Sequence, residues 1–361
     1  MANYLILSCD GGGIRGYLSS LLLKRLNEEF DILGLNGIGP NKPMIDLFAG
    51  TSTGGLIALA LAQGKSIDSV VDLYATQGAN IFNPLDLQLR CLFPKPGDFA
   101  IRDIEKAIET DISGLKELWQ VLYDDIGDPS LRTVIESFIP GNPLLSALPG
   151  NVMVPTFQLS DSATPPCWSS LVIDNFPGSA GSSTYLYDAA LSTAAAPVYF
   201  PPYHHPQFGW CSDGGLFANN PAPLAVGRAI EAGHSLSDIV LLSIGTGITP
   251  ASMQVTPDTR LCYGLKYWAW LEQSGSTPPF PILNALMDGV SISNDSLTSS
   301  LLGGSRNGGR YMRVNPALPE SVPLNDYSPA TMQMFRDVAD KYFESDEWKT
   351  IEAWVENTFH K

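Results

Sequence analysis

Residues 44–62 read Met-Ile-Asp-Leu-Phe-Ala-Gly-Thr-Ser-Thr-Gly-Gly-Leu-Ile-Ala-Leu-Ala-Leu-Ala, and this stretch decides which fold the chain can adopt. An apolar run typical of a strand leads into Ser52, and a run typical of a buried helix follows it. Ser52 is flanked by Gly50, Thr51, Thr53 and Gly54, which fits the pattern G-x-S-x-G of a nucleophile elbow. Small residues allow the sharp turn, and the helix N-terminus beyond it stabilises developing negative charge.

An ordinary turn is the alternative interpretation, because a serine caps helices in many α/β proteins. A capping serine does not account for a glycine-rich turn upstream of Ser52 and an Asp-Gly-Gly sequence downstream of it. Both motifs therefore bear on the choice between a turn and a nucleophile.

The upstream motif follows a short apolar run over residues 4–8 and precedes an amphipathic helix predicted over residues 17–30. Gly11, Gly13 and Gly16 also satisfy G-x-G-x-x-G, which is typical of dinucleotide-binding loops. That reading requires a second strand ending in an acidic residue, whereas residues 34–40 are rich in turn-forming residues.

An oxyanion hole is the other interpretation of the same loop. Consecutive glycines at Gly11, Gly12 and Gly13 expose backbone N–H groups that can converge on an anionic oxygen, with Gly12 and Gly13 as the preferred donors. Arg15 lies close to them in sequence and either assists the site or is an ordinary surface or salt-bridged arginine. The sequence leaves both roles of Arg15 open.

The downstream motif is Asp213-Gly214-Gly215. Asp213 is a candidate base for Ser52 in a chain with only four histidines. The alternative is a simple Asp-Gly turn, which is common in loops.

Composition restricts the class of protein further. A chain of 361 residues with 44% hydrophobic residues can bury a large α/β core, and a net charge of −16 argues against nucleic acid as a partner. Five widely spaced cysteines without C-x-x-C pairs predict neither a disulfide framework nor a zinc site. With no apolar run long enough to span a membrane and no basic leader, we expect a cytoplasmic protein, with peripheral membrane association left open.

The elements expected along the rest of the chain alternate between strands and helices. We predict helices over residues 102–112, 130–138, 185–195 and 329–359, and strands over residues 152–159, 169–175 and 238–247, the last being the final core strand. Residues 272–310 are rich in Gly and Ser and are expected to be mobile. The aromatic stretch 261–271 is expected to be either a lid or a buried helix.

The three motifs, in this order, resemble those of the patatin-like phospholipases. The similarity lies in residues 10–16, 50–54 and 213–215, and it continues through residues 192–202, Asn219-Asn220-Pro221 and Tyr311-Met312-Arg313-Val314. It implies an α/β fold of three layers, with a mostly parallel sheet between helices. We expect one domain over residues 1–361, with a helical insertion at 77–150 and a C-terminal extension at 250–361 that packs on the core.

The resemblance also implies a serine lipid acyl hydrolase that acts on phospholipid or galactolipid esters. Ser52 would attack the ester, Asp213 would accept its proton, and the glycine loop would hold the oxyanion, with neither a cofactor nor a metal. The chain is also similar to bacterial members that a cyclic nucleotide activates, so a nucleotide activator stays open. A catalytically weak storage or binding protein is the other alternative, and the oligomeric state is undetermined.

A histidine base is the rival to Asp213. His204 and His205 lie in a proline-flanked loop and are expected on the surface, whereas His234 is expected to interact with a helix C-terminus. An essential histidine predicts a loss of activity near about pH 6 to 7, whereas a Ser–Asp dyad is expected to lack that loss.

Overall fold

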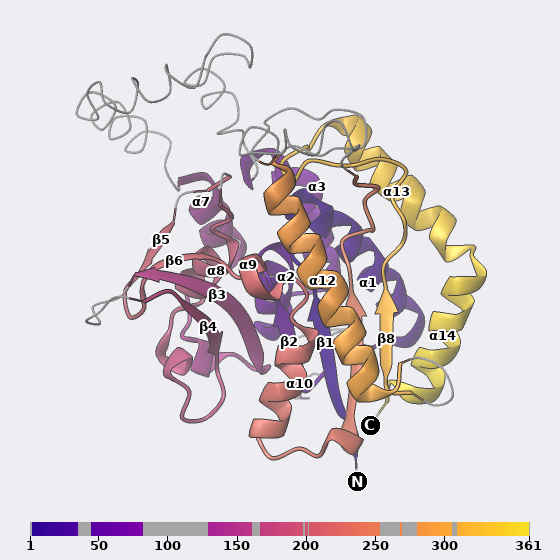
Figure 1. Cartoon of the computed structure of the whole chain (residues 1–361), viewed down its shortest axis with the longest axis horizontal. Helices are drawn as coiled ribbons and strands as arrows, with labels where there is room; N and C mark the ends of the chain where they lie inside the picture. Colours follow the sequence, from indigo (N-terminus) through magenta and orange to yellow (C-terminus); the bar gives the residue numbers. More distant parts are fainter. Residues whose placement is uncertain are drawn as a thin grey trace, which may run out of the picture.

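A mixed β-sheet between two layers of helices forms the centre of the molecule (Figure 1). The computed structural model describes residues 2–34, 45–81, 129–160, 167–197, 199–200, 202–252, 268, 280–304 and 309–360. The strand order is β5-β6-β3-β2-β1-β7-β8, and β4 also pairs with β3. The bounds are β1 Tyr4–Cys9, β2 Leu47–Gly50, β3 Val152–Ser160, β4 Ser169–Asp174, β5 Tyr203–His205, β6 Gly209–Asp213, β7 Ile239–Ile244 and β8 Tyr311–Val314.

The pairs β1–β2, β1–β7, β2–β3 and β7–β8 are parallel, and the pairs involving β4, β5 and β6 are antiparallel. The described helices are α1 Gly16–Phe30, α2 Thr53–Ala62, α3 Ile67–Ile81, α7 Pro129–Phe138, α8 Leu186–Ala194, α9 Gly215–Ala218, α10 Ala222–Glu231, α12 Pro281–Leu302, α13 Pro329–Phe343 and α14 Asp346–Thr358. The predicted α/β class, with a mostly parallel sheet flanked by helices, is confirmed.

Side chains of β1 alternate between two hydrophobic cores, as a strand covered on both faces requires. Leu5 and Leu7 pack with residues of α1, α2, α3, α7, α8, α13 and α14. Ile6 points to the other face and packs with residues of α10 and with Leu302 of α12. Figure 1 shows α12 crossing the sheet on the same side as α10.

The strand register brings the ends of three strands to one level. Cys9 pairs with Gly50, so the loop after β1 runs beside the turn after β2. Ala49 of β2 pairs with Met153 of β3, three residues before Thr156. Thr156 in turn pairs with Asp213 across β3 and β6. Segments that are distant in sequence therefore meet at one edge of the sheet.

Two expectations for the C-terminal part were wrong. Residues 281–302 form α12 rather than a mobile segment, because Pro281 begins the helix, Gly303 (φ 82°) ends it, and Leu283 and Met287 are buried. Nor is β7 the last strand of the sheet, since β8 pairs with it in parallel. Strand β8 has only four residues, which is too short a run for a period of two to identify it as a strand from the sequence.

Several expectations lie outside the described residues. These are the helix at 102–112, the choice between lid and buried helix at 261–271, most of the turn-rich stretch at 34–40, and the central part of the insertion at 77–150. The division of the chain into core, insertion and extension stays a proposal. Among the described helices, none combines the length and the apolar composition needed to cross a membrane.

Candidate functional site

Ser52 occupies a strained turn between β2 and α2. Its backbone has φ 53° and ψ −121°, in the positive half of φ space that non-glycine residues avoid. A Cβ on Gly54 would overlap the carbonyls of Cys9 and Asp10, and one on Gly50 would overlap the backbone of Gly54. Glycine is therefore required on both sides of Ser52, as the elbow motif predicted.

Neighbouring segments hold this turn in place. The Ser52 N–H donates to the Thr193 hydroxyl (3.1 Å), which in turn donates to the Pro155 carbonyl (2.7 Å). The Thr51 hydroxyl donates to the Ala218 carbonyl (2.6 Å). Ser52 is 7% exposed, so a reacting group would have to enter the protein to reach its hydroxyl.

Asp213 lies at the end of β6 beside this turn and is almost fully buried. One carboxylate oxygen accepts the Gly215 N–H (2.6 Å), while the other has no hydrogen-bond partner. Burial raises the pKa of Asp213 to about 6, although the nearby Ser52 hydroxyl and the Gly215 N–H act to lower it. The Ser52 hydroxyl therefore lies within reach of the Asp213 carboxylate.

Gly214 needs to be a glycine for a packing reason, since a Cβ there would overlap the Pro155 carbonyl. A Cβ on Gly215 would lie 3.0 Å from the carboxylate oxygen of Asp213 and 3.2 Å from the Met287 methyl group. The Asp-Gly-Gly sequence therefore packs tightly against β3 and α12 and is more than a surface turn.

The glycine loop lies beside Ser52. A Cβ on Gly11 would lie 3.3 Å from the Ser52 Cβ, and one on Gly12 would meet the Thr246 Cβ at 2.7 Å. Gly13 has φ 60°, and a Cβ there would overlap Leu324. The Gly11 N–H donates to the Asn219 carbonyl (2.9 Å). That leaves the N–H groups of Gly12 and Gly13 for a ligand, so the expectation that all three glycines donate is wrong for Gly11.

A buried ion pair fixes the start of this loop. Both terminal nitrogens of Arg313 donate to Asp10 (2.8 and 2.6 Å), and one also donates to the Ser243 hydroxyl (2.7 Å). Burial by itself would lower the pKa of Arg313, but the Asp10 carboxylate, together with Tyr311 and Asp295, raises it overall. Arg313 lies on β8, so a strand from the C-terminal part of the chain holds the loop after β1.

Arg15 is buried rather than on the surface, with 4% exposure. Its Nε donates to the Gly12 carbonyl (3.3 Å). Burial lowers the pKa of its guanidinium, and Asp288 of α12 has the largest opposing effect. An exposed arginine is excluded, whereas an arginine paired with a carboxylate is not, because Asp288 acts on Arg15 electrostatically. Arg15 also contacts the glycine loop directly.

No histidine of the described residues joins Asp213, because neither carboxylate oxygen accepts an imidazole hydrogen bond. His204 is exposed on β5, where its ring packs edge-on against Trp210. His205 is buried, contrary to expectation, and its Nδ1 accepts the N–H groups of Gln207 and Phe208. His234 packs against the ring of Tyr4 (3.8 Å) near the end of α10.

A dinucleotide site does not fit the strand that follows α1. Strand β2 ends at Gly50 and leads into Thr51 and Ser52, where a ribose-binding acid would be needed. Within the described ranges, no three His, Cys, Asp or Glu side chains lie together in a manner that could hold a metal ion.

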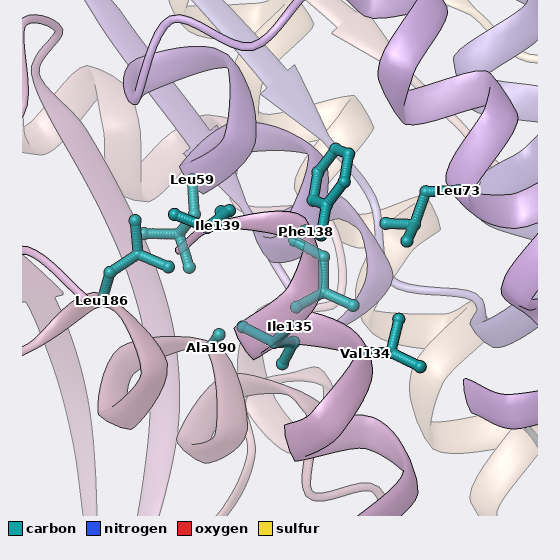
Figure 2. Close-up of a pocket in the computed structure, with 9 residues that line it drawn as sticks. Leu59, Leu73, Val134, Ile135, Phe138, Ile139, Leu186 and Ala190 are labelled. Carbon is teal, nitrogen blue, oxygen red and sulfur yellow. The ribbon is translucent and has the colours of Figure 1, made fainter. Parts of the chain in front are cut away.

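A separate small, partly open pocket lies among α2, α3, α7 and α8 (Figure 2). Its lining is entirely apolar: Leu56, Leu59, Leu73, Val134, Ile135, Phe138, Ile139, Leu186 and Ala190. Figure 2 shows these side chains pointing toward one another from the helices. Because none of them carries a polar group, the pocket cannot supply the chemistry of an active site.

Sequence reasoning assigned no role to Thr193, Asn219, Thr246 or Arg313. Thr193, Asn219 and Arg313 stand in stretches that carried the family resemblance, and this was the available signal. Asn219, Thr246 and Arg313 contact residues more than 200 positions away, and local patterns carry no trace of such contacts.

Comparisons with known proteins agree with this arrangement. A model of the patatin-like phospholipase family matches residues 7–226. Patatin-like protein 2 of Arabidopsis thaliana is 29% identical over 340 residues, which cover 86% of this chain and 74% of that protein. Protein teg of Priestia megaterium is 26% identical over 358 residues, covering 94% and 95%. The cGAMP-activated phospholipase of Vibrio cholerae is 29% identical over 263 residues, covering 69% and 67%.

Proposed function

The chain belongs to the patatin-like phospholipase family and is a hydrolase acting on ester bonds, and from that premise we propose that Ser52 and Asp213 cleave fatty-acyl esters of phospholipids or galactolipids. The observation that carries this proposal is a buried carboxylate, with one free oxygen and a raised pKa, beside a serine in a strained strand-to-helix turn. We include a cytoplasmic location with peripheral contact to membranes in the proposal.

The reaction proceeds in two covalent steps. The Ser52 oxygen attacks the ester carbonyl while its proton passes to Asp213, and the alcohol then leaves with a proton and an acyl group stays on Ser52. Water attacks the acyl-enzyme and gives a proton to Asp213, and Asp213 returns that proton to the Ser52 oxygen as the fatty acid leaves. The negative oxygen that forms in each step lies against the N–H groups of Gly12 and Gly13, near the N-terminus of α2.

Activity-based labelling tests the nucleophile. A fluorophosphonate probe should label the wild-type protein, and Ser52→Ala should abolish labelling and lower ester turnover by about a thousandfold or more. Ser20→Ala removes another buried hydroxyl, which bonds to the Tyr17 carbonyl, and should leave labelling intact. Labelling that persists in folded Ser52→Ala would contradict the assignment.

Activation by a cyclic nucleotide is a candidate for the regulation of this activity. Relatives from Vibrio cholerae and Escherichia coli, each 29% identical over the matched residues, are named cGAMP-activated phospholipases. Turnover measured with and without cGAMP distinguishes a switched enzyme from a constitutive one.

A further inference from the structure

Helix α12 carries few charges for its length. Its 22 residues contain two charged side chains, Asp288 and Asp295. Asp295 accepts a hydrogen bond from the Tyr311 hydroxyl (2.6 Å), and Asp288 interacts electrostatically with the Arg15 guanidinium. Both carboxylates are thus directed toward the body of the protein.

The inner side of α12 contacts the site itself. The Ser291 hydroxyl donates to Asp10 (3.4 Å) and accepts from the Asn219 amide (3.0 Å). Met287 reaches Gly215, next to Asp213. The helix therefore covers the motifs that hold Ser52 and Asp213.

The outer side of α12 carries an apolar stripe, which we define as Ile282, Leu286, Leu297 and Leu301. These residues are 45%, 48%, 50% and 40% exposed. At about 100° per residue they fall within roughly 100° of one another around the helix, and they extend over about 28 Å along it. Ile292 is 68% exposed but lies about 130° from the centre of the stripe, on the same side as Ser296 and Ser299.

We propose that the apolar stripe of α12 rests on the surface of a lipid bilayer and brings the site to its substrate. The proposal rests on the proposed function, because the esters to be cleaved reside in bilayers and Ser52 is 7% exposed. Four large exposed apolar side chains on one face of α12, which also carries Ser293 and Ser300, mark an interaction site. Their leucine and isoleucine chains match the acyl region below lipid headgroups.

Charge indicates which bilayer the stripe fits. The stripe lacks lysine and arginine, and the whole chain has a net charge of −16, so attraction to anionic headgroups contributes nothing. Binding should therefore depend on apolar burial and favour zwitterionic over anionic vesicles. Added salt should reduce the difference between the two, because it screens the repulsion from anionic lipid.

Co-sedimentation with phosphatidylcholine vesicles tests the surface. Ser52→Ala prevents lipid hydrolysis during the binding measurement and serves as the background for all variants. Leu286→Gln/Leu297→Gln removes the centre of the stripe without adding charge, and should lower the bound fraction about tenfold. The matched control Ile292→Gln/Ile248→Gln removes two side chains that are more exposed, at 68% and 57%, but lie off the stripe, and should bind as before.

Turnover by the same variants with Ser52 intact distinguishes an effect on bilayer binding from an effect on ester cleavage. The stripe variant should hydrolyse a soluble short-chain ester at the wild-type rate and lose about tenfold on vesicle lipid. Equal vesicle binding by stripe and control variants overturns the proposal. So does a wild-type dimer in solution that the stripe variant dissociates, because the stripe would then join two copies. Vesicle binding through the stripe without hydrolysis of either ester leaves the surface standing and rejects the proposed function.

Discussion

Asp213 shows how burial makes a carboxylate usable as a base. An ordinary aspartate with a pKa of 3.8 is too weak a base to take a serine proton readily near neutral pH. Burial beside Ser52 raises the pKa to about 6, which brings it closer to the pH at which general bases work best. A raised carboxyl pKa also means that the folded state holds the proton more tightly than the unfolded state.

Asp213→Asn should therefore abolish turnover and stabilise the fold. Above pH 6 the charged carboxylate is unfavourable in the folded protein, so the asparagine variant should gain roughly 2 to 3 kcal/mol at pH 8. The gain should shrink as pH falls through 6 and vanish near 4, where the protonated form prevails in the folded state and begins to prevail in the unfolded one. Urea denaturation at pH 8 and pH 4 measures it, and an asparagine variant less stable at pH 8 would contradict a buried, uncompensated charge.

Histidine variants are needed in addition to Asp213→Asn, because the pH dependence of activity does not distinguish Asp213 from a histidine as the base. With its pKa near 6, Asp213 would lose activity in the same range as an essential histidine, so the expected distinction between about pH 6 and 7 fails. His204→Ala, His205→Ala and His234→Ala should each keep most activity on a soluble ester. One inactive but folded histidine variant would identify that histidine as the base.

At the scale of elements, the glycine loop is shaped by three different segments packed against it. Gly11 contacts Asn219 and Ser52, Gly12 contacts Thr246 at the end of β7, and Gly13 contacts Leu324. The Ile14 N–H of the loop also donates to the Leu324 carbonyl (2.8 Å), and the Gly11 carbonyl accepts from the Asn219 amide (3.4 Å) and the Thr246 hydroxyl (3.3 Å). The position of its free N–H groups therefore depends on parts of the chain far away in sequence.

Gly12→Ala should lower turnover on the order of a hundredfold, the typical effect of losing one oxyanion donor. The added Cβ would collide with the Cβ and Cγ2 of Thr246 (both 2.7 Å), so the loop must shift. Thr246→Gly removes that side chain, and the double variant Gly12→Ala/Thr246→Gly should regain activity relative to Gly12→Ala. The kcat of each variant on a soluble ester tests this prediction. A Gly12→Ala variant with wild-type kcat would mean that the oxyanion donors lie elsewhere.

The sequence predicted the helices and strands that carry the motifs, because the hydrophobic pattern of each of them is contained in a stretch of about ten residues. The strand at Tyr4, the elbow at Ser52 and the strand at Val152 lie where the apolar periodicity put them. Helix α12 was missed because its serines and glycine hid a buried face that is visible only against α9 and α10. The Asp10–Arg313 pair was missed because nothing local links residues 303 positions apart.

At the scale of the whole molecule, the family match ends at residue 226, yet the site needs later residues. Arg313 on β8 pairs with Asp10, the Thr246 hydroxyl donates to the Gly11 carbonyl, and Ser291 bridges Asp10 and Asn219. Helices α13 and α14 add Phe335 and Trp348, both fully buried, to the core that contains α1. We therefore propose that the C-terminal part completes the domain and unfolds together with it.

Trp348→Ala should test this shared unfolding from a position far from the site in sequence. Trp348 is fully buried and packs against the rings of Tyr342 (5.8 Å) and Phe343 (4.7 Å), so its truncation should cost about 3 to 5 kcal/mol of unfolding free energy. Trp168→Ala, at 75% exposure, is the control and should cost little.

Two probes in one urea titration report on different parts of the chain: circular dichroism follows all helices, and fluorophosphonate labelling follows Ser52. If the chain is one cooperative unit, both midpoints coincide in the wild type and both fall together in Trp348→Ala, because losing core packing under α14 destabilises the turn at Ser52 equally. A labelling midpoint that stays unchanged while the helical signal melts earlier would mean that α13 and α14 unfold on their own, and the single domain would have to be divided.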